Sequence, residues 1–212
     1  MPNDSDIDFY FDPTCGWAWR TSIWMRRVAA QRALNVTWIP FSLAVVNSPE
    51  DYNKDSPGHV TGVALERALV MARRTAGNAA VDRLYVAYGN VLHGEVNRQT
   101  VLEPEVQARC LESAGLPSSL VADALADPTT EEEIVNDTKA AIDKLHVFGV
   151  PTLAFQDSDL GFFGPVINCV PEGEDALRLW DFIRPALRVP FLFEFKRTRT
   201  RADAYAASQY AD

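Results

Sequence analysis

The chain has 212 residues, of which 47% are hydrophobic and 23% are charged, a composition typical of a globular protein with a sizeable core. The formal net charge of −9 argues against nucleic acid or an anionic membrane as the main partner, because either would require a basic surface. No apolar stretch approaches the roughly 20 residues of a membrane span, and the acidic start MPNDSD is unlike a signal peptide. We therefore expect a cytoplasmic protein that binds neither nucleic acid nor membrane.

The three cysteines, Cys15, Cys110 and Cys169, are too few and too widely spaced for a disulfide framework. None of them lies at a close spacing from a histidine, so we expect no metal site. Free thiols suit a reducing compartment. Cys110 and Cys169 are predicted to be buried small apolar side chains.

The first predicted strand leads directly to Cys15. Residues 7–11 are rich in strand-forming residues, Asp12-Pro13-Thr14 interrupt the strand, and helical spacing follows to about Leu34. A cysteine at the first turn of a helix lies at the positive end of the helix dipole, which favours the thiolate, the nucleophilic form. Cys15 is therefore predicted to be a reactive cysteine.

A second strand and a long run of helices are predicted next. Val36–Leu43 has strand character, and Pro40 restricts this strand to a sheet edge or a bulge. The order strand, helix, strand predicts a parallel pair. A loop is expected over Ala44–Gly58, and only helical patterns occur from Val60 to His146.

Local residues predict where individual helices begin and end. Pro104 suits the first position of a helix, and Gly115 suits a C-terminal stop. Thr130 and Glu133 have the spacing of a capping box.

Strand character returns after Gly149-Val150-Pro151. The residue pattern predicts an antiparallel hairpin formed by Thr152–Phe155 and Phe162–Val170. It also predicts a final amphipathic helix over Glu172–Leu187. We expect an α/β protein in which residues 1–58 and 147–190 form one domain, residues 59–146 form an inserted helical domain, and residues 191–212 form a C-terminal tail.

This layout resembles a thioredoxin fold with a large all-helical insertion, as in DsbA-like proteins. The resemblance rests on Phe11–Trp19 (FDPTCGWAW) and on Gly149-Val150-Pro151-Thr152. In that superfamily the proline of the second motif is cis and faces the active-site sulfur. The domain formed by residues 1–58 and 147–190 would then be the thioredoxin-like one.

The chain is more similar still to one branch, the actinobacterial mycothiol-dependent nitroreductases and their DsbA-like relatives. Further matching segments are Ser42-Leu43-Ala44 leading to Asn47, Gly89-Asn90 with His93 and Asn97, Phe163–Val166, Leu179-Trp180-Asp181 and Phe193–Thr200. The resemblance implies a thiol-dependent oxidoreductase without a tightly bound cofactor. Its co-substrate would be a low-molecular-weight thiol, mycothiol or glutathione.

The resemblance also implies roles for individual residues. Cys15 would be the nucleophile that reduces a small-molecule or protein disulfide, or a small electrophile, through a mixed disulfide. Trp17 would line the pocket, and Asn47 would face it from a loop. The backbone at Val150-Pro151, followed by Thr152, would pair with the bound thiol.

The active-site motif departs from the usual Cys-Pro-Trp-Cys, because this chain has Cys15-Gly16-Trp17-Ala18. Without a cysteine at position 18, a mixed disulfide on Cys15 cannot be resolved by the usual dithiol route. Either the enzyme uses a monothiol cycle, or alanine stands here in place of a natural cysteine. The sequence leaves both explanations open.

Two other functions fit the same motifs. One is a non-redox thiol-utilising transferase or isomerase, like the kappa-class glutathione transferases and the hydroxychromene-carboxylate isomerases, for which a second cysteine is not needed. The other is a catalytically weak module that binds peptides beside Pro151. His93 is expected to act as a polar cap at a helix end, with contact to the substrate as the less favoured alternative.

Overall fold

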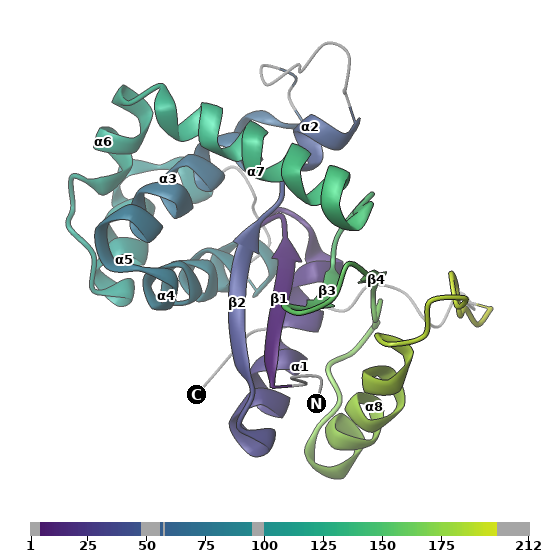
Figure 1. The fold of residues 1–212 in the computed structure, drawn as a ribbon. Helices are drawn as coiled ribbons and strands as arrows, with labels where there is room; N and C mark the ends of the chain where they lie inside the picture. The colour runs from purple at the N-terminus through teal and green to yellow at the C-terminus, as the bar shows by residue number, and fades with distance from the viewer. Residues whose placement is uncertain (1–4, 48–55, 57, 95–99, 199–212) are drawn as a thin grey trace.

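The centre of the computed structural model is a four-stranded sheet with the order β2-β1-β3-β4 (Figure 1). Strands β1 (Asp6–Phe11) and β2 (Asn35–Pro40) are parallel and are joined by helix α1 (Gly16–Arg32). Strand β3 (Thr152–Phe155) continues the sheet antiparallel to β1, and β4 (Gly161–Phe163) pairs antiparallel with β3. The predicted thioredoxin-type fold is confirmed. The structure describes residues 5–47, 56, 58–94 and 100–198.

The outer strands differ in how well they were predicted. Pro40, which lacks an N–H, is at the end of β2 on the sheet edge, as expected. The predicted strand Phe162–Val170 is wrong beyond Phe163, because Gly164 adopts φ +114° and Pro165 cannot donate to a sheet ladder. Cys169 consequently lies in a loop and is exposed, so its predicted burial is also wrong.

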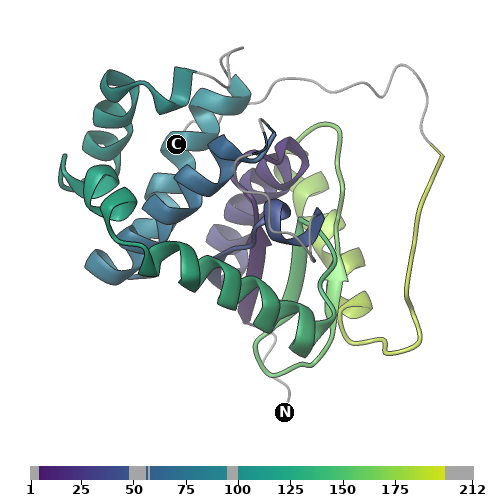
Figure 2. The same ribbon diagram turned by 90° about the horizontal axis from the view of Figure 1, so that it is seen from above.

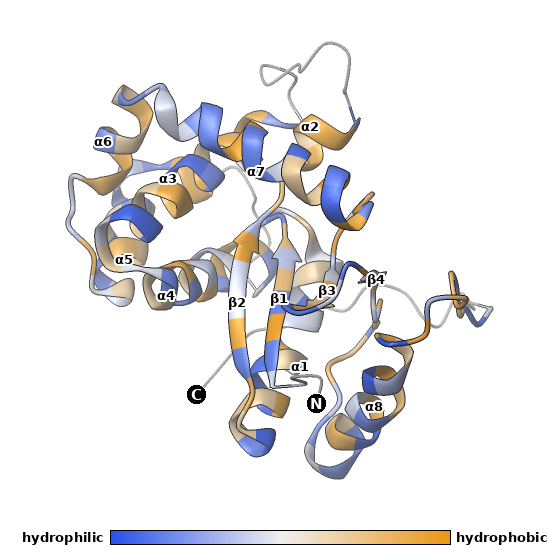
Figure 3. Cartoon of the chain, viewed as in Figure 1, coloured by the Kyte–Doolittle hydropathy of each residue, from blue (hydrophilic) through white to orange (hydrophobic). Residues whose placement is uncertain are grey.

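Helices cover both faces of the sheet (Figure 2). Helix α8 (Gly173–Ala186) packs against α1 on one face, where the indole N–H of Trp24 donates to the carbonyl of Ala176 at 2.9 Å. Helix α7 (Thr129–Leu145) lies along the opposite face. Hydrophobic and hydrophilic residues alternate along α7 and α8, so each helix has one apolar side for packing (Figure 3).

The predicted helical segment is confirmed. Besides α7 it contains α3 (Val60–Ala76), α4 (Asn78–Gly89), a π-helical turn (Asn90–Gly94), a 3₁₀ turn (Thr100–Leu102), α5 (Pro104–Ala114) and α6 (Leu120–Ala126). Pro104 and Gly115 bound α5 as predicted. The loop expected from Ala44 is partly wrong, because a short helix α2 spans Leu43–Asn47. Residues 48–55, Pro57 and Asn97 lie outside the described residues.

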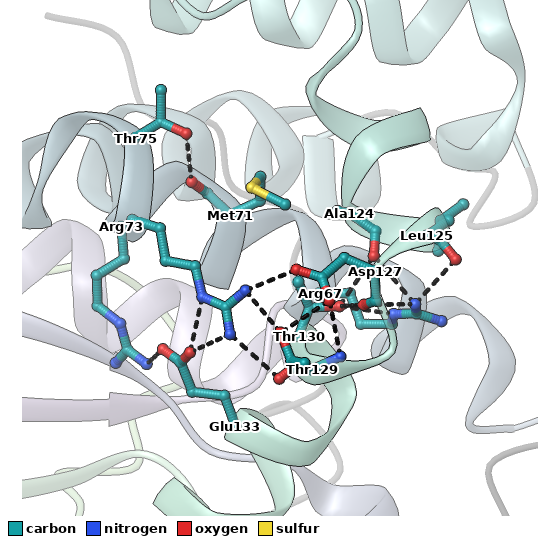
Figure 4. Close-up of polar contacts among 11 residues, drawn as sticks. Arg67, Met71, Arg73, Thr75, Ala124, Leu125, Asp127, Thr129, Thr130 and Glu133 are labelled. Atoms are coloured by element: carbon teal, nitrogen blue, oxygen red, sulfur yellow. Dashed lines mark hydrogen bonds and ion pairs between the residues drawn. The ribbon is translucent and has the colours of Figure 1, made fainter.

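An ion-pair network ties α3 to the α6–α7 segment (Figure 4). Arg74 pairs with Asp127 and Glu133, and Arg73 pairs with Glu133 and Asp137. The capping box predicted from the spacing of residues 130 and 133 is therefore wrong, because the Glu133 carboxylate binds arginines. The start of α7 is instead capped by Asp127, whose Oδ1 accepts from the Thr129 N–H at 2.9 Å.

The sheet, helix α1 and the inserted helices between β2 and β3 share one hydrophobic core. The rings of Phe11 on β1 and Tyr85 on α4 stack with their centroids 3.7 Å apart. Trp19 on α1 covers Gly89 at the end of α4, where a Cβ would lie 2.2 Å from the indole ring. The N-terminal turn of α1 is thereby fixed against the insertion.

Candidate functional site

Cys15 is the N-cap residue of α1. Its backbone is extended, with φ −82° and ψ 104°, and its Sγ accepts a weak hydrogen bond from the Ala18 N–H at 3.5 Å. The Sγ also lies 3.7 Å from the carbonyl oxygen of Val150. The Val150–Pro151 peptide is cis, so the structure brings together the two motifs that the sequence singled out.

The turn before Cys15 is organised by Asp12, which is only 3% exposed. Its Oδ1 accepts from the N–H and the hydroxyl of Thr14, at 2.8 and 2.6 Å. Its Oδ2 accepts from the N–H of Leu43 at 3.1 Å, and its backbone carbonyl accepts from the N–H of Cys15 at 3.0 Å. One buried carboxyl group thus connects the strand end, the cysteine turn and helix α2.

The loop that carries Pro151 is fixed by hydrogen bonds of its own. The Thr152 hydroxyl is buried and donates to the carbonyl of Gly149 at 2.8 Å. The carbonyl of Pro151 accepts from Gly164 N–H at 2.8 Å, and Thr21 on α1 donates to the carbonyl of Pro165 at 2.7 Å. Thr152 therefore positions the loop through its side chain.

The other residues of the motif differ in exposure. Gly16 is buried, and Ala18 is completely buried. Trp17 is half-buried, and the guanidinium carbon of Arg20 lies 5.3 Å from its ring centroid. Trp17 thus keeps part of its surface available beside Cys15.

A cavity of about 170 Å³ lies on the Thr14 side of the turn. Its polar lining comes from Asp12, Thr14, Ser42, Asn47 and His59. Asn47 is exposed at the end of α2 and lines this cavity. Cys15 and Trp17 are not among the described residues that line this cavity, so Trp17 and Asn47 do not share it.

His93 lies closer to the cysteine turn than its sequence position indicated. It belongs to the π-helical turn after α4, is buried, and its Nε2 lies 3.0 Å from the carbonyl oxygen of Pro13. A carbonyl only accepts, so Nε2 carries the proton in this contact. The expectation of a simple helix cap is wrong. A π-helical turn is the kind of local irregularity that often marks functional sites, but periodicity alone does not reveal it.

Glu66 on α3 is the second group that the sequence did not single out. It is fully buried, and neither carboxyl oxygen has a hydrogen-bond partner among the described residues. Burial and, secondly, the charge of Asp12 raise the pKa of Glu66 well above its ordinary value of 4.5. The hint in the sequence is an acid that, with Arg67, interrupts an apolar stretch of α3.

Two phenylalanines form an exposed aromatic pair near the cis-proline loop. Phe148 is 69% exposed and Phe163 is 41% exposed, and their ring centroids are 5.1 Å apart. Phe148 is two residues before Val150, so this pair offers an apolar surface next to the cis-proline loop.

The three cysteines have different environments. All are free thiols, Cys15 being half-buried, Cys110 buried as predicted and Cys169 exposed. Burial raises the pKa of the Cys110 thiol to about 11, which leaves it unreactive at neutral pH. Within the described ranges there is no group of three or more metal-binding side chains, and no helix long and apolar enough to cross a membrane.

These features define a class. A cysteine that caps a helix and faces a cis-proline, on a four-stranded sheet with a helical insertion, is the arrangement of a DsbA-like thioredoxin-fold protein. Residues 14–197 match the family described as "Rv2466c-like: Mycothiol-dependent nitroreductase Rv2466c". The chain belongs to this family of thiol-dependent oxidoreductases.

Relatives agree with this assignment. "Uncharacterized protein Rv2286c" of Mycobacterium tuberculosis (strain ATCC 25618 / H37Rv) is 32% identical over 207 residues, which cover 96% of this chain and 86% of that protein. A 2-hydroxychromene-2-carboxylate isomerase has a similar structure, with TM-score 0.58 and 18% identity over 86% of this chain and 96% of that one. The cytosolic disulfide reductase DsbM from Pseudomonas aeruginosa with GSH gives TM-score 0.57 and 14% identity over 87% and 100%. At such identities the structural matches establish the fold alone.

Proposed function

We propose that this protein is a mycothiol-dependent reductase that works by a monothiol cycle on Cys15. The observation that carries the proposal is the position of the Cys15 sulfur, at the N-terminus of α1 and 3.7 Å from the backbone before cis-Pro151. The helix N-terminus favours the thiolate, and the backbone of the loop would pair with a bound thiol. Family membership supports mycothiol over glutathione as that thiol.

The cycle needs one protein cysteine. The Cys15 thiolate attacks a sulfur of a disulfide that contains mycothiol, forms a mixed disulfide with mycothiol, and releases the other half as a thiolate. A second mycothiol thiolate then attacks the mycothiol sulfur, releases Cys15 as a thiolate and leaves as oxidised mycothiol. Overall, the mixed disulfide of substrate and mycothiol reacts with one free mycothiol thiolate to give the substrate thiolate and oxidised mycothiol. One disulfide bond breaks and one forms, the substrate sulfur is reduced as the incoming mycothiol sulfur is oxidised, and the cycle balances without a cysteine at position 18.

The surroundings of Cys15 suggest where the two reactants bind. We assign the exposed part of Trp17 and the backbone of Val150 and Pro151 to the thiol, with Thr152 positioning that backbone. Asn47 would contact the polar end of the thiol from the adjacent cavity. The aromatic pair Phe148 and Phe163 offers an apolar surface for the disulfide or small electrophile that is reduced.

The same proposal includes the arrangement of domains and the compartment. Residues 1–58 and 147–190 would carry the chemistry, residues 59–146 would cover it, and residues 191–212 would form a tail. A thiol cycle that depends on reduced mycothiol requires a reducing compartment, which agrees with a cytoplasmic location.

The direct test is a mass measurement after incubation with oxidised mycothiol, and separately with oxidised glutathione. We expect one adduct per chain on Cys15, formed faster with mycothiol and removed by reduced mycothiol. The measurement is made on the Cys169→Ser variant, which lacks the exposed second thiol. The matched control is the double variant in which Cys15 is also replaced by serine, and it should form no adduct. Turnover of a mixed disulfide that survives Cys15→Ser would contradict the proposal.

The buried Ala18 also favours a second candidate, a thiol-utilising isomerase or transferase, because such an enzyme needs no second thiol. In this case the protein would activate a bound thiol and exchange no electrons. Isomerisation or conjugation at a catalytic amount of thiol, without an adduct on Cys15 and without oxidised thiol as product, would establish this candidate. A third possibility, peptide binding beside Pro151, predicts binding of unfolded peptide with no thiol chemistry.

A further inference from the structure

The buried carboxyl groups of Asp12 and Glu66 come from different parts of the chain and lie behind the cysteine turn. Asp12 ends β1 and is 3% exposed, whereas Glu66 is in the second turn of α3 and is completely buried. Gly62, one turn before Glu66 on α3, lies against Asp12, since a Cβ at this glycine would be 3.7 Å from both carboxyl oxygens of Asp12. The charges of Asp12 and Glu66 therefore interact. Two carboxyl groups in such a position cannot both be ionised without repelling each other in a medium that screens poorly.

The carboxylate of Asp12 holds the cysteine turn and the start of α2 by hydrogen bonds. It accepts three hydrogen bonds, two from Thr14 and one from Leu43, and each suits a carboxylate acceptor. Glu66 accepts none from the described residues, although both of its oxygens are buried. Of the two groups, Glu66 is therefore the one that holds the proton.

No other described acid on the neighbouring helices competes for this role. The acids that the α6–α7 segment brings to the arginines of α3 are Asp127, Glu131, Glu133 and Asp137, and each of the four is paired with Arg67, Arg73 or Arg74. The hydroxyl of Ser42 is buried near Glu66 and also lacks a partner among the described residues. The buried hydroxyls of Ser42 and Tyr85 also belong to the polar groups behind the turn, since Ser42 interacts with Glu66 and Tyr85 interacts with Asp12.

We infer that protonated Glu66 is a positioning residue for the Cys15 turn, because its neutral carboxyl lets Asp12 keep the hydrogen bonds that shape this turn. Ionised Glu66 repels Asp12 and loosens its bonds to Thr14 and Leu43. The N–H of Cys15 bonds to the backbone of Asp12 itself, at 3.0 Å, so the disturbance reaches the nucleophile within one turn. Glu66 does not touch the sulfur and acts only through Asp12. The inference rests on the proposed role of Cys15 as the nucleophile.

The first test follows the proton directly. Carbon-13 NMR of the side-chain carboxyl of Glu66, recorded as a function of pH, should give a titration midpoint well above 4.5. In Asp12→Asn the repelling charge is gone, so the midpoint should fall by about one pH unit or more. An ordinary midpoint in the parent protein, or the same midpoint in both proteins, would overturn the inference.

The second test measures the reactivity of Cys15 without any substrate. The rate of alkylation of the Cys15 peptide by iodoacetamide is followed from acid to alkaline pH in the Cys169→Ser background. The parent should show an extra fall in rate at the pH where the Glu66 signal titrates. Glu66→Gln, which is neutral at every pH, should lack this fall and keep the parent's neutral-pH rate, and Asp12→Asn should slow alkylation by about tenfold. Glu112→Gln, an exposed acid on α5, is the matched control and should behave like the parent.

The outcomes separate this inference from the proposed function. A Cys15 that reacts no faster than an unfolded cysteine peptide would contradict the proposed nucleophile. A reactive Cys15 whose pH profile is the same in the parent and in Glu66→Gln would overturn only the role of Glu66. If Glu66→Gln fails to fold, the NMR comparison of the parent with Asp12→Asn still decides the matter.

Discussion

The sulfur of Cys15 lies between a donor and an acceptor, the Ala18 N–H at 3.5 Å and the carbonyl of Val150 at 3.7 Å. As a thiol, Cys15 can donate to Val150. As a thiolate, it can only accept, and then the N–H of Ala18 at the first turn of α1 stabilises its charge. The carbonyl of Val150 can accept only from the thiol, so the thiol and the thiolate each have one of these two groups as partner. This balance suits a nucleophile that is also a leaving group.

Ala18→Cys should change the fate of the mixed disulfide. Residues 15 and 18 are three apart at the start of a helix, so their side chains lie on the same face. We expect the new thiol to attack the adduct on Cys15, release the bound thiol and leave an intramolecular disulfide. Intact mass would show the loss of two hydrogens in place of the adduct.

Ala18→Ser is the matched control for that change, because serine fills the same space without a thiol. It should retain the persistent adduct of the parent. A persistent adduct in Ala18→Cys as well would mean that the turn cannot bring the two sulfurs together.

Gly89→Ala should destabilise the fold. A Cβ at this position would lie 2.2 Å from the ring of Trp19, which is completely buried and cannot move away without disturbing α1. Overpacking of this kind costs about 1–3 kcal/mol. Thermal unfolding followed by circular dichroism should therefore give a melting temperature several degrees lower.

Gly62→Ala is the same substitution in a different environment. There the Cβ would make ordinary contacts, at 3.6 Å to Thr14 and 3.7 Å to Asp12, within helix α3. Since alanine is favoured over glycine in a helix by about 1 kcal/mol, this variant should be as stable as the parent or more so. Equal losses in both variants would show that helix ends, and not the Trp19 contact, decide the result.

The fold could be predicted largely because local chemistry and motif spacing agreed with it. Pro104 and Gly115 begin and end α5 as their backbone preferences require. Val150-Pro151, far from Cys15 in the chain, could be paired with it only through the resemblance to a known fold. Residue patterns alone indicated a strand start at that point.

The parts that could not be predicted depend on tertiary partners. Glu133 has capping-box spacing from Thr130, yet the two arginines of α3 bind it more strongly than a backbone N–H would. Cys169 was expected to be buried, but the early end of β4 leaves it exposed. Asp12 and Glu66 are 54 positions apart (66 − 12 = 54), and no sequence period connects an acid at a strand end with one inside a helix.

Glu133→Gln should reduce stability in a pH-dependent way. Burial opposes its charge, but the hydrogen bonds and charges of Arg73 and Arg74 outweigh burial and lower the pKa of Glu133 below its ordinary 4.5. A lowered pKa gives stability that is present above pH 4.5 and is lost as the pH falls through the folded-state pKa. The variant should melt a few degrees below the parent at neutral pH, and the difference should shrink in acid. A difference that does not depend on pH would assign the loss to packing.

Glu66→Gln should have the opposite pH dependence. Because the pKa of Glu66 is raised by burial and by Asp12, the folded protein binds more protons than the unfolded chain above pH 4.5. The parent therefore loses stability as the pH rises from about 4.5 toward the folded-state pKa of Glu66, and glutamine, which does not titrate, avoids this loss. The melting temperature of Glu66→Gln relative to the parent should rise with pH over this range, whatever its value in acid. Measured beside Glu133→Gln in the same buffers, the two differences should change in opposite directions. The difference for Glu133→Gln becomes more negative as the pH rises toward 4.5, and that for Glu66→Gln becomes more positive above pH 4.5. A flat or falling difference for Glu66→Gln would mean that this buried carboxyl group ionises as readily as an exposed one.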